Sequence, residues 1–137
     1  MKPHQHILLV EDDDIDALTV RRTLKEIGAS NPLDRVSDGE QALRFLRDPA
    51  NPRPGLILLD LNMPRMNGLE FVAVVKNDPD LRLIPVVVLT TSSEEGDRVA
   101  AFSNSVAGYM VKPVDYPQFV GIIGLIRDYW MTSVTPT

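Results

Sequence analysis

Residues 56–68 read LILLDLNMPRMNG. Four apolar residues with no polar alternation are typical of a strand that is buried on both faces, and Asp60 ends the run. The asparagines, proline and glycine that follow favour turns. We therefore expect a short buried strand at 56–59 with a carboxylate at its carboxyl end.

The same arrangement recurs before and after this stretch. Each further strand candidate precedes a helical pattern. The last helix runs from Tyr116 to about Trp130, and we expect Asp115 to cap it, as Asp38 caps the helix that follows it. Because fully apolar strands that alternate with helices form parallel sheets, we predict an α/β fold, a doubly wound five-stranded parallel sheet with helices on both faces. The other four strand candidates are 7–10 (ILLV), 33–36, 85–89 (PVVVL) and 108–111 (GYMV).

Length and composition limit the class of protein. The 137 residues suit a single domain, with a core at about 6–130 and a short tail at 131–137. The net charge of −5, without a basic stripe, argues against direct nucleic-acid binding. No apolar run reaches the roughly 18 residues that span a bilayer, so we expect no membrane segment. With no cysteine and no signal-peptide pattern, we expect a cytoplasmic protein.

Chemically reactive side chains follow the predicted strands. Glu11 and Asp12 follow the first strand, Asp60 the third, Thr90 the fourth and Lys112 the fifth. The carboxyl ends of parallel strands share one edge of the sheet, where ligands bind. Crowded carboxylates without histidine or cysteine favour a hard cation, and Mg²⁺ fits best. Lys112 and Thr90 then suit phosphoryl oxygens, with Asp60 as the nucleophile.

Each of these residues also has an ordinary structural explanation. An Asp after a strand is often a helix cap, a lone lysine is usually solvated, and a threonine at a strand end is usually a β-former. The functional interpretation therefore depends on all of them lying at one edge of one sheet.

Four motifs make the chain resemble the receiver domains of bacterial two-component response regulators, which have a flavodoxin-like fold. They are ILLVEDD at 7–13, LILLDLNMPRMNG at 56–68, VVVLTTS at 86–92 and GYMVKPVD at 108–115. The resemblance implies that phosphorylation changes protein–protein contacts. It also implies a signalling protein rather than an enzyme, one that catalyses only its own phosphorylation and dephosphorylation.

The resemblance also assigns roles to individual residues. It implies that Asp60 accepts the phosphoryl group and that Lys112 contacts this group. The Lys112–Pro113 bond resembles one that is cis in receivers, so a cis peptide is expected there. The remaining roles are Glu11 and Asp12 as Mg²⁺ ligands, Asn62 as a backbone-carbonyl ligand, Thr90 as the switch hydroxyl and Tyr109 as the aromatic ring that follows the switch.

Three segments are similar to one subgroup, the small stand-alone regulators paired with phytochrome-type sensor kinases. They are NDPDLRLIPVVVLTTS at 77–92, KPVDYPQF at 112–119 and the YW pair at 129–130. This similarity implies a sensor histidine kinase as partner, a bacteriophytochrome among the candidates. Glu11 stands where receivers more commonly have Asp, and residues 96–110 and 133–137 depart from the subgroup's usual sequence.

The last predicted helix is apolar on more than one side. Its main stripe is Phe119, Ile122, Ile123, Ile126 and Trp130. Val120 and Leu125 lie on other faces, and Gly121 and Gly124 would allow another backbone to approach. We expect a homodimer or kinase-docking face at Val120, Ile122, Ile123 and Leu125. The alternative is that strand side chains and the tail cover this surface.

Two rival functions remain open. A haloacid-dehalogenase-type phosphatase also uses a strand-end Asp, but Asn62 stands where such an enzyme carries its second Asp, and the chain has no room for a cap domain. A degenerate receiver that serves only as a protein-binding scaffold would not need Glu11, Asp12, Asp60, Thr90 and Lys112 together.

Overall fold

The computed structural model describes residues 1–134 of the chain. Its five strands are β1 (Ile7–Val10), β2 (Leu33–Val36), β3 (Leu56–Leu59), β4 (Val86–Thr90) and β5 (Gly108–Val111). They pair in parallel in the order β2-β1-β3-β4-β5. The predicted sheet is confirmed, and the only shifted boundaries are those of β4, which begins and ends one residue later than expected.

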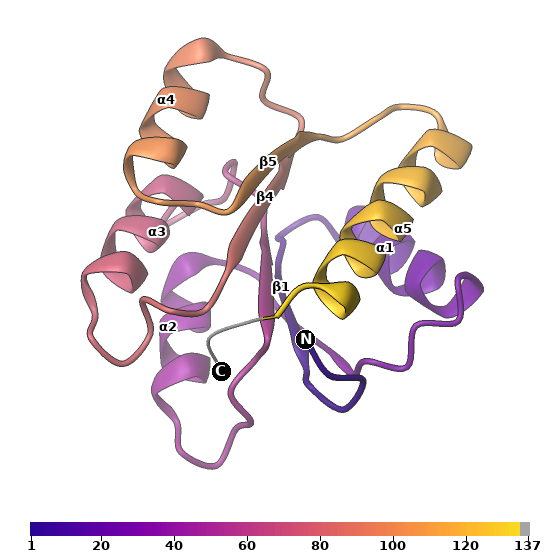
Figure 1. Cartoon of the computed structure of the whole chain (residues 1–137). Helices are drawn as coiled ribbons and strands as arrows, with labels where there is room; N and C mark the ends of the chain where they lie inside the picture. Colours follow the sequence, from indigo (N-terminus) through magenta and orange to yellow (C-terminus); the bar gives the residue numbers. More distant parts are fainter. Residues whose placement is uncertain (135–137) are drawn as a thin grey trace.

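Five helices cover the two faces of this sheet. They are α1 (Asp14–Glu26), α2 (Gly39–Arg47), α3 (Gly68–Asn77), α4 (Glu95–Ser103) and α5 (Tyr116–Thr132). Figure 1 shows α1 and α5 on one side of the sheet and α2, α3 and α4 on the other. The doubly wound α/β fold predicted from the apolar strands is therefore confirmed.

Alternate residues of the central strands β1 and β3 point into two separate cores, which explains why no polar residue interrupts these two strands. In β1, Leu8 and Val10 pack against α2, α3 and α4, whereas Ile7 and Leu9 pack against α1 and α5. The strands are only four or five residues long. Polar groups can therefore appear as soon as a strand leaves the cores, at its carboxyl end.

Three local expectations need correction. Helix α5 continues to Thr132, so Met131 and Thr132 are helical, and residues 135–137 of the predicted tail lie outside the described residues. The Lys112–Pro113 peptide is trans, because residues 1–134 contain no cis peptide bond. Asp115 precedes α5 at the capping position, but its side chain makes no capping hydrogen bond.

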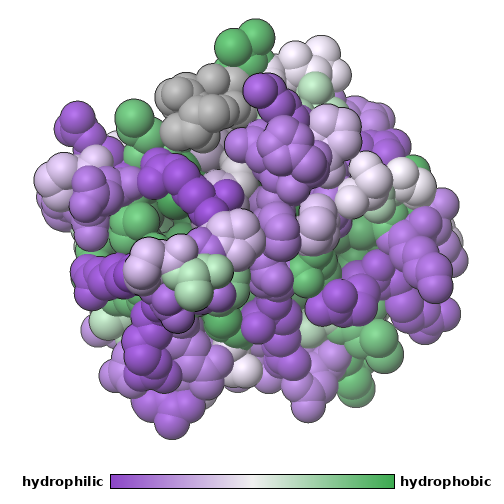
Figure 2. Space-filling model, turned by 90° about the horizontal axis from the view of Figure 1, so that it is seen from below, coloured by the Kyte–Doolittle hydropathy of each residue, from purple (hydrophilic) through white to green (hydrophobic). Residues whose placement is uncertain are grey.

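The surface at the end of the sheet where the strands begin is mainly polar. Figure 2 looks at this end of the molecule from below, and hydrophilic side chains separate the hydrophobic ones into small areas. Among residues 1–134, no helix is long and apolar enough to cross a membrane.

A glycine brings the start of α3 against the backbone that follows β3. A Cβ on Gly68 would lie 2.6 Å from the carbonyl oxygen of Asp60 and 2.7 Å from the Cα of Leu61. Both atoms belong to the backbone and cannot move aside easily. Only glycine therefore allows α3 to pack this closely behind Asp60.

An ion pair holds the loop between β3 and α3 against the start of α2. Asp38 caps α2 by accepting the Gln41 N–H at 2.9 Å, and its other carboxylate oxygen accepts from the Arg65 guanidinium at 2.9 Å. Arg65 has a φ of 60°, in the left-handed region that non-glycine residues rarely adopt. The Gly39 N–H also donates to the Met66 carbonyl at 3.2 Å, so two contacts fix this loop.

We expect Asp38→Ala to lower the free energy of unfolding by about 1–2 kcal/mol, because it removes both the helix cap and the Arg65 partner. Asp38→Asn should cost less, since Asn also caps helices. The Gln41 N–H lowers the pKa of the Asp38 carboxyl, burial opposes this and Arg65 adds to the lowering. Because the pKa of Asp38 is lower in the folded protein than the 3.8 of the unfolded chain, its ionised form stabilises the fold at pH values above 3.8. This stabilisation is lost as the pH falls through the pKa of Asp38 in the folded protein. Urea unfolding at several pH values should therefore show the advantage of wild type over Asp38→Asn shrinking below about pH 4.

Candidate functional site

Three carboxylates meet at the carboxyl edge of the sheet. One oxygen from each of Glu11, Asp12 and Asp60 lies within 4.8 Å of the others. The register explains this, because Val10 at the end of β1 is paired with Leu59 at the end of β3. Glu11 and Asp60 are 1% and 7% exposed, whereas Asp12 is open to solvent. The cluster thus combines two buried carboxylates with one accessible carboxylate.

A buried lysine lies against this cluster. The Lys112 ammonium donates to the Glu11 carboxylate and, at 2.8 Å, to Asp16 of α1, and it lies 3.6 Å from the nearest Asp60 oxygen. Burial alone would lower the pKa of Lys112, but the hydrogen bonds to Asp16 and Glu11 outweigh it and raise the pKa above its ordinary value. Lys112 is therefore a fixed positive charge at neutral pH.

The electrostatics of the cluster favour a bound cation. Burial raises the pKa of Glu11 to about 7, against the effect of the hydrogen bond from Lys112. One ammonium does not neutralise Glu11, Asp12 and Asp60, and all their donor atoms are oxygens. Oxygen ligands with an exposed side suit Mg²⁺, which keeps several of its waters. The residues present therefore fit the predicted metal.

Asn62 lies beside the proposed acceptor. It is exposed, and its N–H donates to an Asp60 carboxylate oxygen at 3.4 Å. This contact helps to orient the Asp60 carboxyl group. Asn62 belongs to the loop between β3 and α3, which Gly68 and Arg65 keep in place. The role of the Asn62 carbonyl as a metal ligand stays a prediction.

The two predicted switch residues are connected through a third residue. Thr90 is fully buried at the end of β4, and its hydroxyl accepts from the Ser92 N–H at 3.3 Å. The Tyr109 hydroxyl of β5 donates to the Ser92 carbonyl at 2.9 Å. The Ser92 hydroxyl in turn donates to Asp97 in the first turn of α4. A change at Thr90 can therefore reach both Tyr109 and α4 through the backbone of Ser92.

Sequence reasoning missed Ser92 and Asp16 at this edge. Ser92 is part of the motif at 86–92, but nothing in the motif shows that its backbone lies between Thr90 and Tyr109. Asp16 follows Asp12 by four residues, about one helical turn. Asp12 lies before α1 and Asp16 lies in its first turn, so this spacing could not show that Asp16 reaches Lys112.

The predicted docking face is only partly available. Leu125 is 68% exposed, and Val120 and Ile122 are half-buried. Ile123 is 1% exposed and packs in the core beneath α1 and α5, so including it in the face was wrong. The cause is geometric, because Ile123 lies on the same stripe as Phe119 and Ile126, which face the sheet.

The helix glycines show no tight packing inside the chain. A Cβ added to Gly121 or Gly124 would meet no neighbouring atom within 4 Å among the described residues. Neither glycine is therefore required for the internal packing of α5. The prediction that they allow another backbone to approach is not tested by the fold.

Comparisons with known proteins agree with this site. The family model described as the response regulator receiver domain matches residues 7–123, and the chain belongs to this family. Response regulator Rcp1 of Synechocystis sp. is 39% identical over 137 residues, an alignment that covers 97% of this chain and 93% of Rcp1.

Two solved structures extend the comparison. The phosphorylated cyanobacterial phytochrome response regulator RcpA has a TM-score of 0.92 and 37% identity, covering 98% of this chain and 99% of RcpA. The Mn²⁺-bound form of Rcp1 has a TM-score of 0.90 and 38% identity, covering 97% of this chain and 99% of the Rcp1 chain. The receiver fold and the resemblance to phytochrome response regulators are thus confirmed.

Proposed function

We propose that this protein accepts a phosphoryl group from a sensor histidine kinase on Asp60 in a Mg²⁺-dependent reaction. One observation carries the proposal. Asp60 lies at the end of β3, within the Glu11–Asp12 cluster and 3.6 Å from the Lys112 ammonium. The chain's membership in the receiver family and its similarity to a relative solved in its phosphorylated form support the same role.

The chain's own residues define how the transfer would proceed. An Asp60 carboxylate oxygen attacks the phosphorus atom, the new oxygen–phosphorus bond forms, and the bond from phosphorus to the donor breaks in line with it. Glu11, Asp12, Asp60 and the Asn62 carbonyl would hold Mg²⁺, which when bound neutralises charge on the cluster and on the transferred group. Lys112 supplies a further positive charge to a phosphoryl oxygen.

Phosphorylation would then act on the connected residues behind the site. The new group adds about 1.5–2 negative charges and acceptor oxygens that the Thr90 hydroxyl can satisfy. If Thr90 turns toward them, the Ser92 N–H loses its acceptor. The Ser92 carbonyl that holds Tyr109 then shifts, and the surface formed by α4, β5 and α5 changes. Such a change need only bias two states that already exist.

The rival functions lack comparable support. A haloacid-dehalogenase-type phosphatase would need a second Asp near Asp60, and Asn62 occupies that position. A scaffold without phosphorylation would not need a buried lysine beside a buried carboxylate cluster, which is costly to maintain.

The proposed upstream partner is a sensor histidine kinase of the phytochrome type. This proposal depends on the similarity to Rcp1 and to RcpA, which is called a cyanobacterial phytochrome response regulator. A cytoplasmic location stays a prediction, as does the assignment of residues 1–137 to one receiver domain. Catalysis limited to its own phosphorylation and dephosphorylation is likewise part of the proposal.

We also propose that the protein forms a homodimer through α5 and β5. Leu125 and Tyr129 are 68% and 61% exposed. They border a groove of about 350 Å³ that β5 and α5 enclose, with Val87, Ala107, Gly108, Met110, Ile126 and Trp130 as its other lining residues. A second copy would cover this largely apolar surface symmetrically, since a twofold contact places the same face on both partners.

Sedimentation at micromolar concentration should show a dimer for the wild type and a monomer for Leu125→Glu, because the new carboxylate would be desolvated in the apolar interface. Leu83→Glu is the matched control, since Leu83 is also half-exposed but lies before β4, away from this groove. A wild-type monomer in both phosphorylation states would contradict the proposal, as would a dimer that Leu125→Glu leaves intact.

A further inference from the structure

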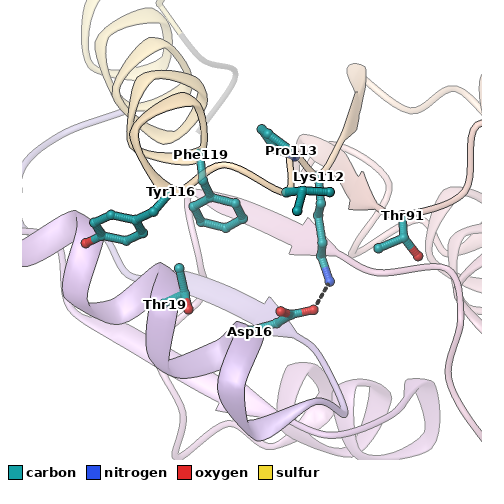
Figure 3. A pocket seen from close by; sticks show the side chains of 8 residues that line it. Asp16, Thr19, Thr91, Lys112, Pro113, Tyr116 and Phe119 are labelled. Carbon is teal, nitrogen blue, oxygen red and sulfur yellow. Dashed lines mark hydrogen bonds and ion pairs between the residues drawn. The ribbon is translucent and has the colours of Figure 1, made fainter.

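Helix α1 contributes a carboxylate to Lys112 that the proposed reaction does not use. Asp16 lies in the first turn of α1, and Figure 3 shows its carboxylate facing the Lys112 ammonium beside a cavity. The two groups are 2.8 Å apart. The cavity has a volume of about 370 Å³ and is also lined by Thr19, Tyr116 and Phe119.

The distances rank the three carboxylates around Lys112. The ammonium has three N–H donors, and it forms hydrogen bonds with Glu11 and Asp16. The nearest Asp60 oxygen is 3.6 Å away, beyond hydrogen-bonding distance. In this state the lysine is therefore bound more closely to α1 than to the acceptor carboxylate.

Asp16 differs from the other two carboxylates in its chemical role. Glu11 and Asp60 belong to the cluster of possible metal ligands, whereas Asp16 does not. Its side chain is 36% exposed, while that of Lys112 is only 5% exposed. Asp16 is thus a counterion for the lysine outside the cluster of possible metal ligands, and a phosphoryl group on Asp60 would compete with it for the same N–H donors.

We propose that Asp16 is a positioning residue that draws the Lys112 ammonium toward α1 and so limits how tightly Lys112 pairs with a phosphoryl group on Asp60. The proposal rests on the phosphoacceptor function given above. It assigns Asp16 no contact with the reacting atoms. Its effect would be to set the balance between the unphosphorylated and phosphorylated states.

Binding of beryllium fluoride, which mimics a phosphoryl group on a carboxylate, tests this at equilibrium under saturating Mg²⁺. Asp16→Asn should bind it roughly fivefold more tightly than wild type, the scale of one partly exposed charge-assisted hydrogen bond. Asp16→Glu keeps the charge and should restore an affinity near that of wild type. Asp115→Asn is the matched control, because it removes an exposed carboxylate that follows Lys112 by three residues in the chain and makes no capping bond.

A second measurement does not depend on phosphorylation. Unfolding free energies of Asp16→Asn, Lys112→Ala and the double variant should be non-additive, because the two side chains form one ion pair. Additive values would overturn the inference even if Asp60 is phosphorylated normally. So would an unchanged or weaker affinity in Asp16→Asn, or an equal gain in Asp115→Asn. If the wild type does not bind beryllium fluoride although the Asp16→Asn and Lys112→Ala unfolding free energies are non-additive, the result would instead count against the phosphoacceptor function.

Discussion

Asp60→Asn is expected to abolish phosphorylation completely. The amide lacks the carboxylate oxygen that attacks phosphorus. Asp60 is the carboxylate that directly follows β3, and it lies in the acidic cluster beside Lys112. Incubation of the wild type with Mg²⁺ and acetyl phosphate should add one phosphoryl group, which is stable in acid and labile in base. Intact-protein mass spectrometry measures both proteins directly.

The fold should survive this substitution. Asn has nearly the same shape as Asp and can still accept the Asn62 N–H, and removing a buried charge relieves repulsion in the cluster. Asp80→Asn is a suitable control, because Asp80 is exposed in the loop after α3 and lies outside the cluster. Labelling that is unchanged in a folded Asp60→Asn protein would refute the assignment of Asp60 as the acceptor.

The second large effect is expected from Asp12→Ala. This residue is exposed, so its removal costs little packing, but it removes one of three possible metal ligands. Mg²⁺ affinity should fall by roughly tenfold or more, because even residues that only orient metal ligands have effects of this size. Metal-dependent phosphorylation should fall with it. The free energy of unfolding without metal should stay constant or rise, since one repelling carboxylate is gone.

Calorimetric titration with Mg²⁺ and urea unfolding separate these two effects. Asp14→Ala provides the comparison, because Asp14 is an exposed carboxylate two residues away that pairs with Arg35 rather than joining the cluster. A less stable Asp12→Ala protein that binds Mg²⁺ like the wild type would show that Asp12 has a structural role only.

Much of the fold could be predicted because each element carries a local signal. Four-residue apolar runs such as those of β1 and β3 are sufficient to indicate strands buried on both faces. Asp38 is a typical capping residue, and its carboxylate accepts a hydrogen bond from the helix that follows. The carboxyl-edge rule then placed Glu11, Asp60, Thr90 and Lys112 together without any coordinates.

Other features depend on distances between segments that are remote in the chain. The Asp16–Lys112 pair joins residues 96 positions apart, and neither side chain has a local pattern that indicates the other. Which residues of α5 are exposed could not be predicted for the same reason. Periodicity placed Ile122 and Ile123 in one stripe, but it could not show that the sheet buries Ile123 almost fully while leaving Ile122 at the margin.

The amino-acid pattern alone was enough for the order of the elements along the chain, the two-sided burial of the central strands and the polar side chains at the strand ends, because these follow from local polarity and spacing. The three-dimensional packing determined which carboxylates hold Lys112, how Ser92 connects Thr90 to Tyr109, and which apolar residues of α5 remain exposed. These properties arise where separate helices and strands meet, so they depend on positions in space that no single segment of the sequence encodes.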